Sequence, residues 1–187
     1  MYNVPNLLSF SRIVATVLVF VLVIVNQPWA FLTATVVFFL ASITDFFDGY
    51  LARRYHIISL LGIFLDMTAD KVFVSAILVA FVQVGLVPAW IVVIIITREF
   101  VVTGLRSMAA AKGTVIPAGQ LGKQKTFITL VAMGGILLGM GLGASHLSLF
   151  PLRLNFNSNL LNVGDYLLLI ADALMVIAVI WTILSGV

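Results

Sequence analysis

Residues 45–70 read DFFDGYLARRYHIISLLGIFLDMTAD, and this stretch decides how the chain folds. It holds four of the seven acidic residues of the protein, Asp45, Asp48, Asp66 and Asp70. A short polar run, Arg53-Arg54-Tyr55-His56, separates the apolar segments on either side. Because so short a connection joins neighbouring helices that run in opposite directions, the stretch predicts an antiparallel helix pair.

The aspartates are spaced to share helical faces. Asp45 and Asp48 are three residues apart near the end of the first helix, and Asp66 and Asp70 are four apart near the start of the second. Side chains at these spacings lie on one face of a helix. We therefore expect the four carboxylates to converge at one end of the helix pair.

The composition around this stretch is that of a protein embedded in lipid. Of the 187 residues, 63% are hydrophobic and 9% are charged, whereas a soluble domain carries about 25% charged residues. So little polar surface cannot cover a water-soluble globule. The chain also has no cysteine, which excludes a disulfide framework, a thiolate metal site and a cysteine nucleophile.

Six segments are long and apolar enough for transmembrane helices, which need about 20 residues each. They are 6–26, 29–51, 60–84, 87–111, 123–143 and 160–187. The sequence thus predicts an all-α integral membrane protein, with residues 1–187 forming a single transmembrane domain. The first segment lacks a basic start and contains Arg12, so we expect a retained helix and no cleaved leader.

The basic residues indicate the orientation. Six spans place both termini on one side of the membrane, and only Arg153 belongs to the other side. The remaining basic residues lie in the half nearest the termini: Arg12, Arg53, Arg54, Lys71, Arg98, Arg106, Lys112, Lys123 and Lys125. By the positive-inside rule, both termini and the aspartates are expected to face the cytoplasm.

Carboxylates gathered in this way indicate a cation site. Each one inside a span costs about 2.5–3.5 kcal/mol on insertion scales. Hard oxygen ligands suit Mg²⁺, Mn²⁺ or Ca²⁺, and Mg²⁺ shares its coordination shell with substrate phosphates. Gly49, Ala52 and Gly62 are small enough to let a phosphate approach the backbone, and Arg53 offers it a forked donor. Two alternatives remain, aspartates that pair with basic residues as helix contacts and a small cation or proton transporter.

The segment from Asp45 to Asp70 resembles the signature of the CDP-alcohol phosphotransferases, D-x2-D-G-x2-A-R-x8-G-x3-D-x3-D, and matches it at every position. Within that family the chain resembles the bacterial branch that makes phosphatidylglycerophosphate, although Met67 and Ser9 depart from the common pattern of that branch. Further matching residues are Asn3 to Asn6 with Arg12, Asp70-Lys71, Thr97 to Phe100, Gly104 to Arg106, and Gly122 to Thr126.

The resemblance implies a reaction of phospholipid biosynthesis. A hydroxyl of glycerol 3-phosphate attacks the β-phosphorus of CDP-diacylglycerol, giving phosphatidylglycerophosphate and CMP. It also implies a homodimer among the lipids of a bacterial cell membrane, an active site that faces the cytoplasm, and no nucleic-acid partner. The acceptor stays open at this stage, because inositol phosphate, serine or phosphatidylglycerol could use the same aspartates.

The resemblance also implies roles for individual residues. Two Mg²⁺ ions, or Mn²⁺, would be held by Asp45, Asp48, Asp66 and Asp70. Asp70 would in addition be the general base. CDP-diacylglycerol would be contacted by Asp45, Gly49, Ala52, Arg53 and Ser59.

The acceptor phosphate needs several cationic donors, because a buried dianion is costly without them. We predict that it is bound by Arg98, Arg106, Lys123 and Lys125. The same residues suit topology signals and contacts to anionic lipids. Arg98 has a further structural alternative, in which Glu99 or backbone carbonyls satisfy it.

Two groups of residues in the last two segments are expected to pack helices together and to have no catalytic role. Gly135, Gly139 and Gly143 recur every four residues, which is typical of closely packed helices. Asp165 and Asp172 lie in the outer half of the last segment, where we expect a polar contact between helices or subunits.

Overall fold

The computed structural model describes residues 4–55, 60–112, 120–144, 147–148, 153–154 and 162–185. Side chains are described over 11–44, 68–112, 122, 124–144 and 162–185. These ranges form six helices: α1 (Val4–Val25), α2 (Pro28–Tyr55), α3 (Leu60–Gln83), α4 (Ala89–Ala111), α5 (Gln120–Gly141) and α6 (Val163–Leu184). The all-helical prediction is confirmed, and each predicted segment overlaps one helix.

A short hairpin between α5 and α6 was not predicted. Strand β1 (Leu147–Ser148) pairs antiparallel with β2 (Arg153–Leu154), so that Leu147 lies opposite Leu154. The predicted helix ends also differ in places. α2 continues to Tyr55, beyond the expected end at residue 51, because Leu51, Ala52 and Arg53 are all strong helix formers.

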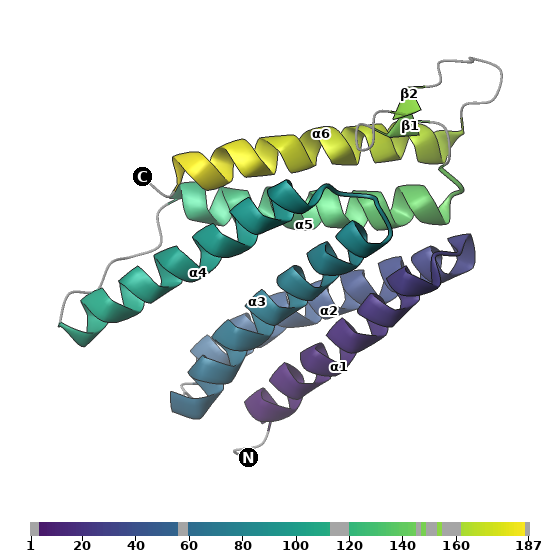
Figure 1. Ribbon diagram of the computed structural model, residues 1–187. Coiled ribbons are helices and arrows are strands. Elements are labelled where there is room, and N and C mark those ends of the chain that lie inside the picture. The colour runs from purple at the N-terminus through teal and green to yellow at the C-terminus, as the bar shows by residue number, and fades with distance from the viewer. Residues whose placement is uncertain are drawn as a thin grey trace.

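Successive helices run up and down, so the start of α1 and the end of α6 lie at the same end of the bundle (Figure 1). We call this the terminal end. α1 packs on α2 and α3, α2 packs on α5, and α5 packs on α6. α4 packs more lightly, on α3 and α6. The rings of Phe38 in α2 and Phe73 in α3 stack with their centroids 5.4 Å apart, so these two helices touch through side chains. Over their described residues, α2 and α3 each pack closely on α1 and not on one another.

Residues with a left-handed backbone conformation (positive φ) follow the ends of three helices. Asn26 between α1 and α2 has φ 53°, and Pro28 then begins α2, a position that suits proline. Gly85 and Gly143 follow α3 and α5 with φ of 75° and 82°. No described atom outside the immediate chain neighbours lies within 4 Å of a Cβ built on Gly143. The prediction that Gly143 packs between helices is therefore wrong, because this residue makes a turn.

The other two glycines of that series do pack closely, inside the bundle. A Cβ on Gly135 would lie 2.9 Å from the Cβ of Ala171 in α6. A Cβ on Gly139 would lie 3.1 Å from the carbonyl oxygen of Gly164 and 3.1 Å from the nitrogen of Leu168. α5 and α6 therefore approach each other more closely than helices that carry side chains at these positions could.

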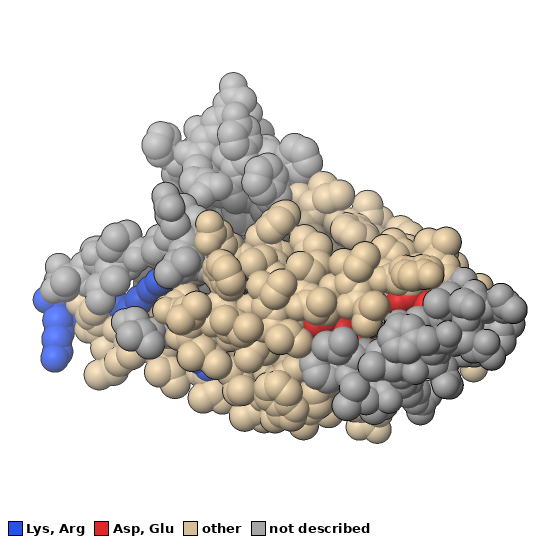
Figure 2. Space-filling view, turned by 90° about the horizontal axis from the view of Figure 1, so that it is seen from above, with Lys and Arg blue, Asp and Glu red and all other residues tan. Residues whose placement is uncertain are grey.

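Apolar side chains cover much of the outside. Among the described side chains of α1, the large apolar residues that are exposed are Ile13, Val14, Val17, Leu18, Val21, Ile24 and Val25. Figure 2 shows a face on which most of the described surface is uncharged. In the described part of the chain, two helical segments are long and apolar enough to cross a membrane, Gln124–Gly141 and Val163–Leu184. Ser11–Val25 and Pro28–Thr44 are shorter apolar helices. This exterior suits contact with lipid.

Candidate active site

A cavity of about 320 Å³ lies among α1 to α5. Its polar lining residues are Arg12, Ser42, Asp70, Lys71, Ser75, Glu99, Thr103, Lys125, Thr126 and Thr129. Arg12 and Lys125 lie near the starts of α1 and α5, and Thr103 lies in the second half of α4. The cavity is therefore nearer the terminal end of the bundle, where the sequence predicts the site.

Asp70 of α3 lines this cavity and is held by α1. Nη1 of Arg12 donates a hydrogen bond to Oδ1 of Asp70 in an ion pair. The Arg12 side chain is only 6% exposed, whereas the Asp70 side chain is 50% exposed. The carboxylate is thus anchored from the protein side and accessible from the cavity, an arrangement that a general base requires.

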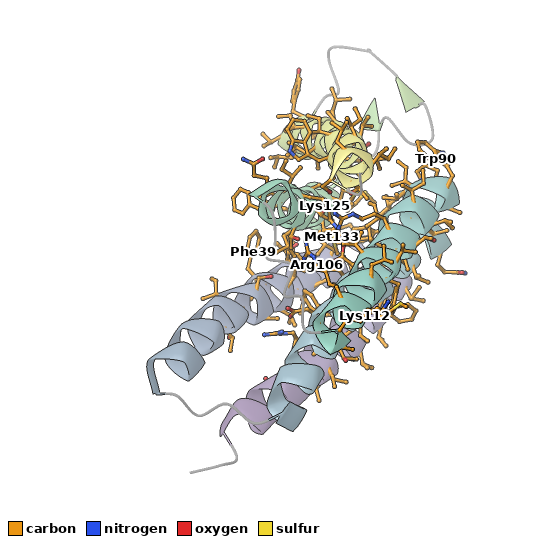
Figure 3. The ribbon with its side chains drawn as sticks, turned by 90° about the vertical axis from the view of Figure 1, so that its left-hand side faces the viewer. Phe39, Trp90, Arg106, Lys112, Lys125 and Met133 are labelled. Carbon is orange, nitrogen blue, oxygen red and sulfur yellow. The ribbon has the colours of Figure 1, made fainter. Side chains whose placement is uncertain are left out.

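A second ion pair lies across the cavity wall, between α4 and α5. Nζ of Lys125 donates a hydrogen bond to Oε2 of Glu99. The Lys125 side chain is 4% exposed and that of Glu99 is 34% exposed. Lys125, which the sequence places in the acceptor pocket, therefore lies in the same cavity as Asp70. In Figure 3 it lies in the interior of the bundle, while Lys112 lies toward the end of α4.

Arg98 makes a structural contact. Its Nη2 donates hydrogen bonds of 2.7 Å to the carbonyl oxygen and to Oγ of Ser185, just after α6. Its Nη1 lies 3.6 Å from Oε2 of Glu99. This agrees with the structural alternative, because a backbone carbonyl and Glu99 contact the two terminal nitrogens of the guanidinium. The buried Nε of Arg98 has no hydrogen-bond partner among the described residues. Arg98 and the half-buried Arg106 are not among the described lining residues of the cavity.

Most of the predicted donor and metal ligands lie outside the described side chains. The helical backbone of α2 includes Asp45, Asp48, Gly49, Ala52 and Arg53, that of α3 includes Asp66, and that of α5 includes Lys123. Ser59 lies outside the described residues altogether. Among the side chains that are described, no three acidic or histidine residues gather as a metal site. The convergence of the four aspartates stays a prediction.

The structure adds three charged residues to the site that the sequence did not assign to it: Arg12, Lys71 and Glu99. Arg12 and Lys71 had served only as indicators of orientation and resemblance. A signal for Arg12 was present, because it is the only charged residue in the first 44 positions. An arginine inside an apolar segment needs a polar partner, which makes it a candidate for a functional contact.

The profile of the CDP-alcohol phosphatidyltransferase family matches residues 2–184, which include all the described helices that line the cavity. The chain belongs to this family. The CDP-alcohol phosphatidyltransferase described here is also similar to two bacterial proteins named CDP-diacylglycerol–glycerol-3-phosphate 3-phosphatidyltransferase. The Bacillus subtilis protein is 39% identical over 150 residues, covering 74% of this chain and 78% of the relative. The Rickettsia bellii protein is 33% identical over 184 residues, covering 98% and 91%.

Membership of a transferase family decides between the enzyme and the ion transporter that the aspartates alone left open. The match extends well beyond the aspartate signature. It includes Arg12 in α1 and the Glu99–Lys125 pair, which joins α4 to α5. The cavity of this CDP-alcohol phosphatidyltransferase is therefore the candidate active site.

Proposed function

We propose that this chain transfers the phosphatidyl group of CDP-diacylglycerol to glycerol 3-phosphate, giving phosphatidylglycerophosphate and CMP. One observation carries the assignment: an accessible carboxylate, Asp70, and a buried acceptor-side lysine, Lys125, line a single cavity. The names of the Bacillus and Rickettsia relatives support the choice of both substrates.

In the proposed reaction, a hydroxyl oxygen of glycerol 3-phosphate forms a bond to the β-phosphorus of CDP-diacylglycerol. The bond from that phosphorus to the bridging oxygen breaks, and CMP leaves with the oxygen. Asp70 takes the proton of the attacking hydroxyl, for which its half-exposed carboxylate is accessible. The Arg12 guanidinium fixes the orientation of the carboxylate from the buried side.

We assign two Mg²⁺ ions, or Mn²⁺, to Asp45, Asp48, Asp66 and Asp70. The donor chemistry fits, because the Asp70 carboxylate faces the cavity and hard carboxylate oxygens suit these ions. Ser42, three residues before Asp45 in α2, also lines the cavity. When bound, such ions neutralise a pyrophosphate and stabilise the leaving oxygen. Removal of divalent ions with a chelator should then stop CMP release, and added Mg²⁺ should restore it.

The substrate contacts follow from the same arrangement. We assign Gly49, Ala52, Arg53 and Ser59, together with Asp45, to the CDP part of the donor. On the acceptor side we assign Arg106, Lys123 and Lys125 to the phosphate. Arg98 supports this wall indirectly, since its contact with Ser185 ties α4 to the end of α6.

We further propose that all six helices span a bacterial cell membrane with both termini in the cytoplasm. The exposed apolar side chains of the helices support the lipid environment. The excess of basic residues in the half nearest the termini supports the orientation. Cysteines introduced one at a time at Asn26 and Lys112 test it, since a membrane-impermeant thiol reagent should label only Asn26 from outside intact cells. We expect the protein to be a homodimer in the membrane, which its mass in detergent would test.

The test of the reaction is CMP release by the purified protein in detergent with CDP-diacylglycerol and Mg²⁺. We expect CMP only when glycerol 3-phosphate is added, with phosphatidylglycerophosphate as the lipid product. Release with inositol phosphate, serine or phosphatidylglycerol in its place would replace the acceptor and keep the chemistry. No release with any of the four alcohols would reject the proposed function.

A further inference from the structure

The charges in the cavity are not fully paired. Its described lining contains three cationic side chains, Arg12, Lys71 and Lys125, and two acidic ones, Asp70 and Glu99. Arg12 pairs with Asp70, and Lys125 pairs with Glu99. Lys71 makes no ion pair with any residue that the structure describes. Among the described cations of this wall, Lys71 therefore needs no exchange of partners before it binds an anion.

Lys71 is placed beside the proposed base. It follows Asp70 directly in α3, it is half-buried, and both side chains line the same cavity. A lysine carries three donors on a flexible four-carbon stem, so it can follow a phosphate that shifts during a reaction. Much of the remaining wall is apolar, including Phe73, Ile95 and Leu130. Low polarity around an ammonium group strengthens its attraction to an anion.

The acceptor phosphate suits Lys71 better than the donor pyrophosphate does. In the proposed function the pyrophosphate is neutralised by cations at the aspartates, whereas the phosphate of glycerol 3-phosphate depends on protein side chains. The two ends of that small molecule must be held together in the cavity, with its hydroxyl at Asp70. A cation on the residue next to Asp70 meets this requirement, because both side chains line the same cavity.

We propose that Lys71 binds the phosphate of the acceptor and makes the enzyme select a phosphorylated alcohol. This inference rests on the proposed function and adds to it a donor from α3, a helix that takes no part in the Glu99–Lys125 pair. The charge of Lys125 is already partly neutralised by Glu99, so Lys125 attracts the same phosphate less strongly than Lys71 does. Lys71 then provides the first contact, and Lys125 the second.

The test compares Lys71→Gln with Lys71→Arg and with a matched control, Lys112→Gln, at an exposed lysine at the end of α4. We expect Lys71→Gln to raise the KM for glycerol 3-phosphate by about 10- to 100-fold, the range of a hydrogen bond to a charged group. The KM for CDP-diacylglycerol should change by less than about twofold, because the substitution removes no hydrogen bond to the donor. Lys71→Arg should recover much of the loss, and Lys112→Gln should behave as wild type.

Several outcomes would overturn the proposal. An unchanged KM for glycerol 3-phosphate would do so, and so would a rise confined to the KM for CDP-diacylglycerol, which would place Lys71 at the donor. A large fall in the melting temperature of Lys71→Gln would also overturn it, because the lysine would then be structural.

A binding measurement separates this proposal from the reaction itself. Calorimetry of glycerol 3-phosphate binding, without CDP-diacylglycerol, does not depend on turnover. Weaker binding by Lys71→Gln than by Lys112→Gln supports the phosphate site even where the wild type releases no CMP, a result that would reject only the proposed reaction. Equal binding by the two variants rejects the phosphate site.

Discussion

Substitution of Gly164 by alanine should separate α5 from α6. The new Cβ would lie 2.7 Å from the carbonyl oxygen of Gly139, 3.0 Å from the nitrogen of Ala144 and 3.1 Å from the carbonyl oxygen of Leu142. All three are backbone atoms, so no side chain can rotate aside. The shortest contact falls about 0.7 Å below an ordinary contact of 3.4 Å, and the two helices must move apart to relieve it.

The expected cost follows from the overpacking. Forcing an extra methyl group into a closely packed site costs about 1–3 kcal/mol. Alanine recovers up to about 1 kcal/mol of helix propensity. Gly164 lies in the first turn of α6, where this gain is at its smallest. A net loss of about 1–2 kcal/mol corresponds to a melting temperature lower by about 2–8 °C for a chain of this size.

Gly104 supplies the matched control. It lies within α4, and no described atom outside its own helix surroundings comes within 4 Å of a Cβ built on it. Gly104→Ala should therefore leave the melting temperature unchanged or raise it. Thermal unfolding of both variants in one detergent, followed by tryptophan fluorescence, makes the comparison. If Gly164→Ala melts at or above the wild-type temperature, the close approach of α5 and α6 is not as described.

Further substitutions at three residues test the site. Asp70→Asn should abolish CMP release while CMP still binds in a calorimeter, and residual turnover near the wild-type rate would show that another group takes the proton. Arg12→Gln should lower kcat by about tenfold, or about 1.4 kcal/mol, with KM little changed. Arg12→Lys should restore part of kcat, and an unaltered kcat in Arg12→Gln would remove Arg12 from the positioning of Asp70. Arg98→Gln should lower the free energy of unfolding by about 1–2 kcal/mol, because the Ser185 contacts are lost; a stability equal to wild type would mean that solvent replaces them.

The helices could be predicted because length and apolar content decide them locally. Each apolar run of about 20 residues became one helix, and turn residues such as Pro28 and Gly85 lie where the runs end. The glycine spacing led to a wrong prediction at Gly143, the last residue of the series. A four-residue spacing does not reveal where a helix stops, and Gly143 follows the end of α5.

The site could be predicted only in part, for a physical reason. Asp70 could be predicted because the four aspartates of the signature lie on two consecutive helices. Within each helix, the spacing of the residues determines which side chains share a face. The ion pair of Arg12 with Asp70 joins residues 58 positions apart. It depends on α1 packing against α3, which no local pattern specifies. The Glu99–Lys125 pair joins α4 to α5, two helices that both pack on α6.

The cavity draws its wall from five successive helices, each of which supplies at least one polar side chain. A molecule in which any of these helices has not yet docked has no complete wall to present to a substrate. Counting catalytically competent molecules, for instance by the burst of CMP in a first turnover, would therefore count fully assembled ones. The protein can be extracted from the membrane with different detergents. Such a count would then measure how well each extraction preserves the native arrangement of the bundle.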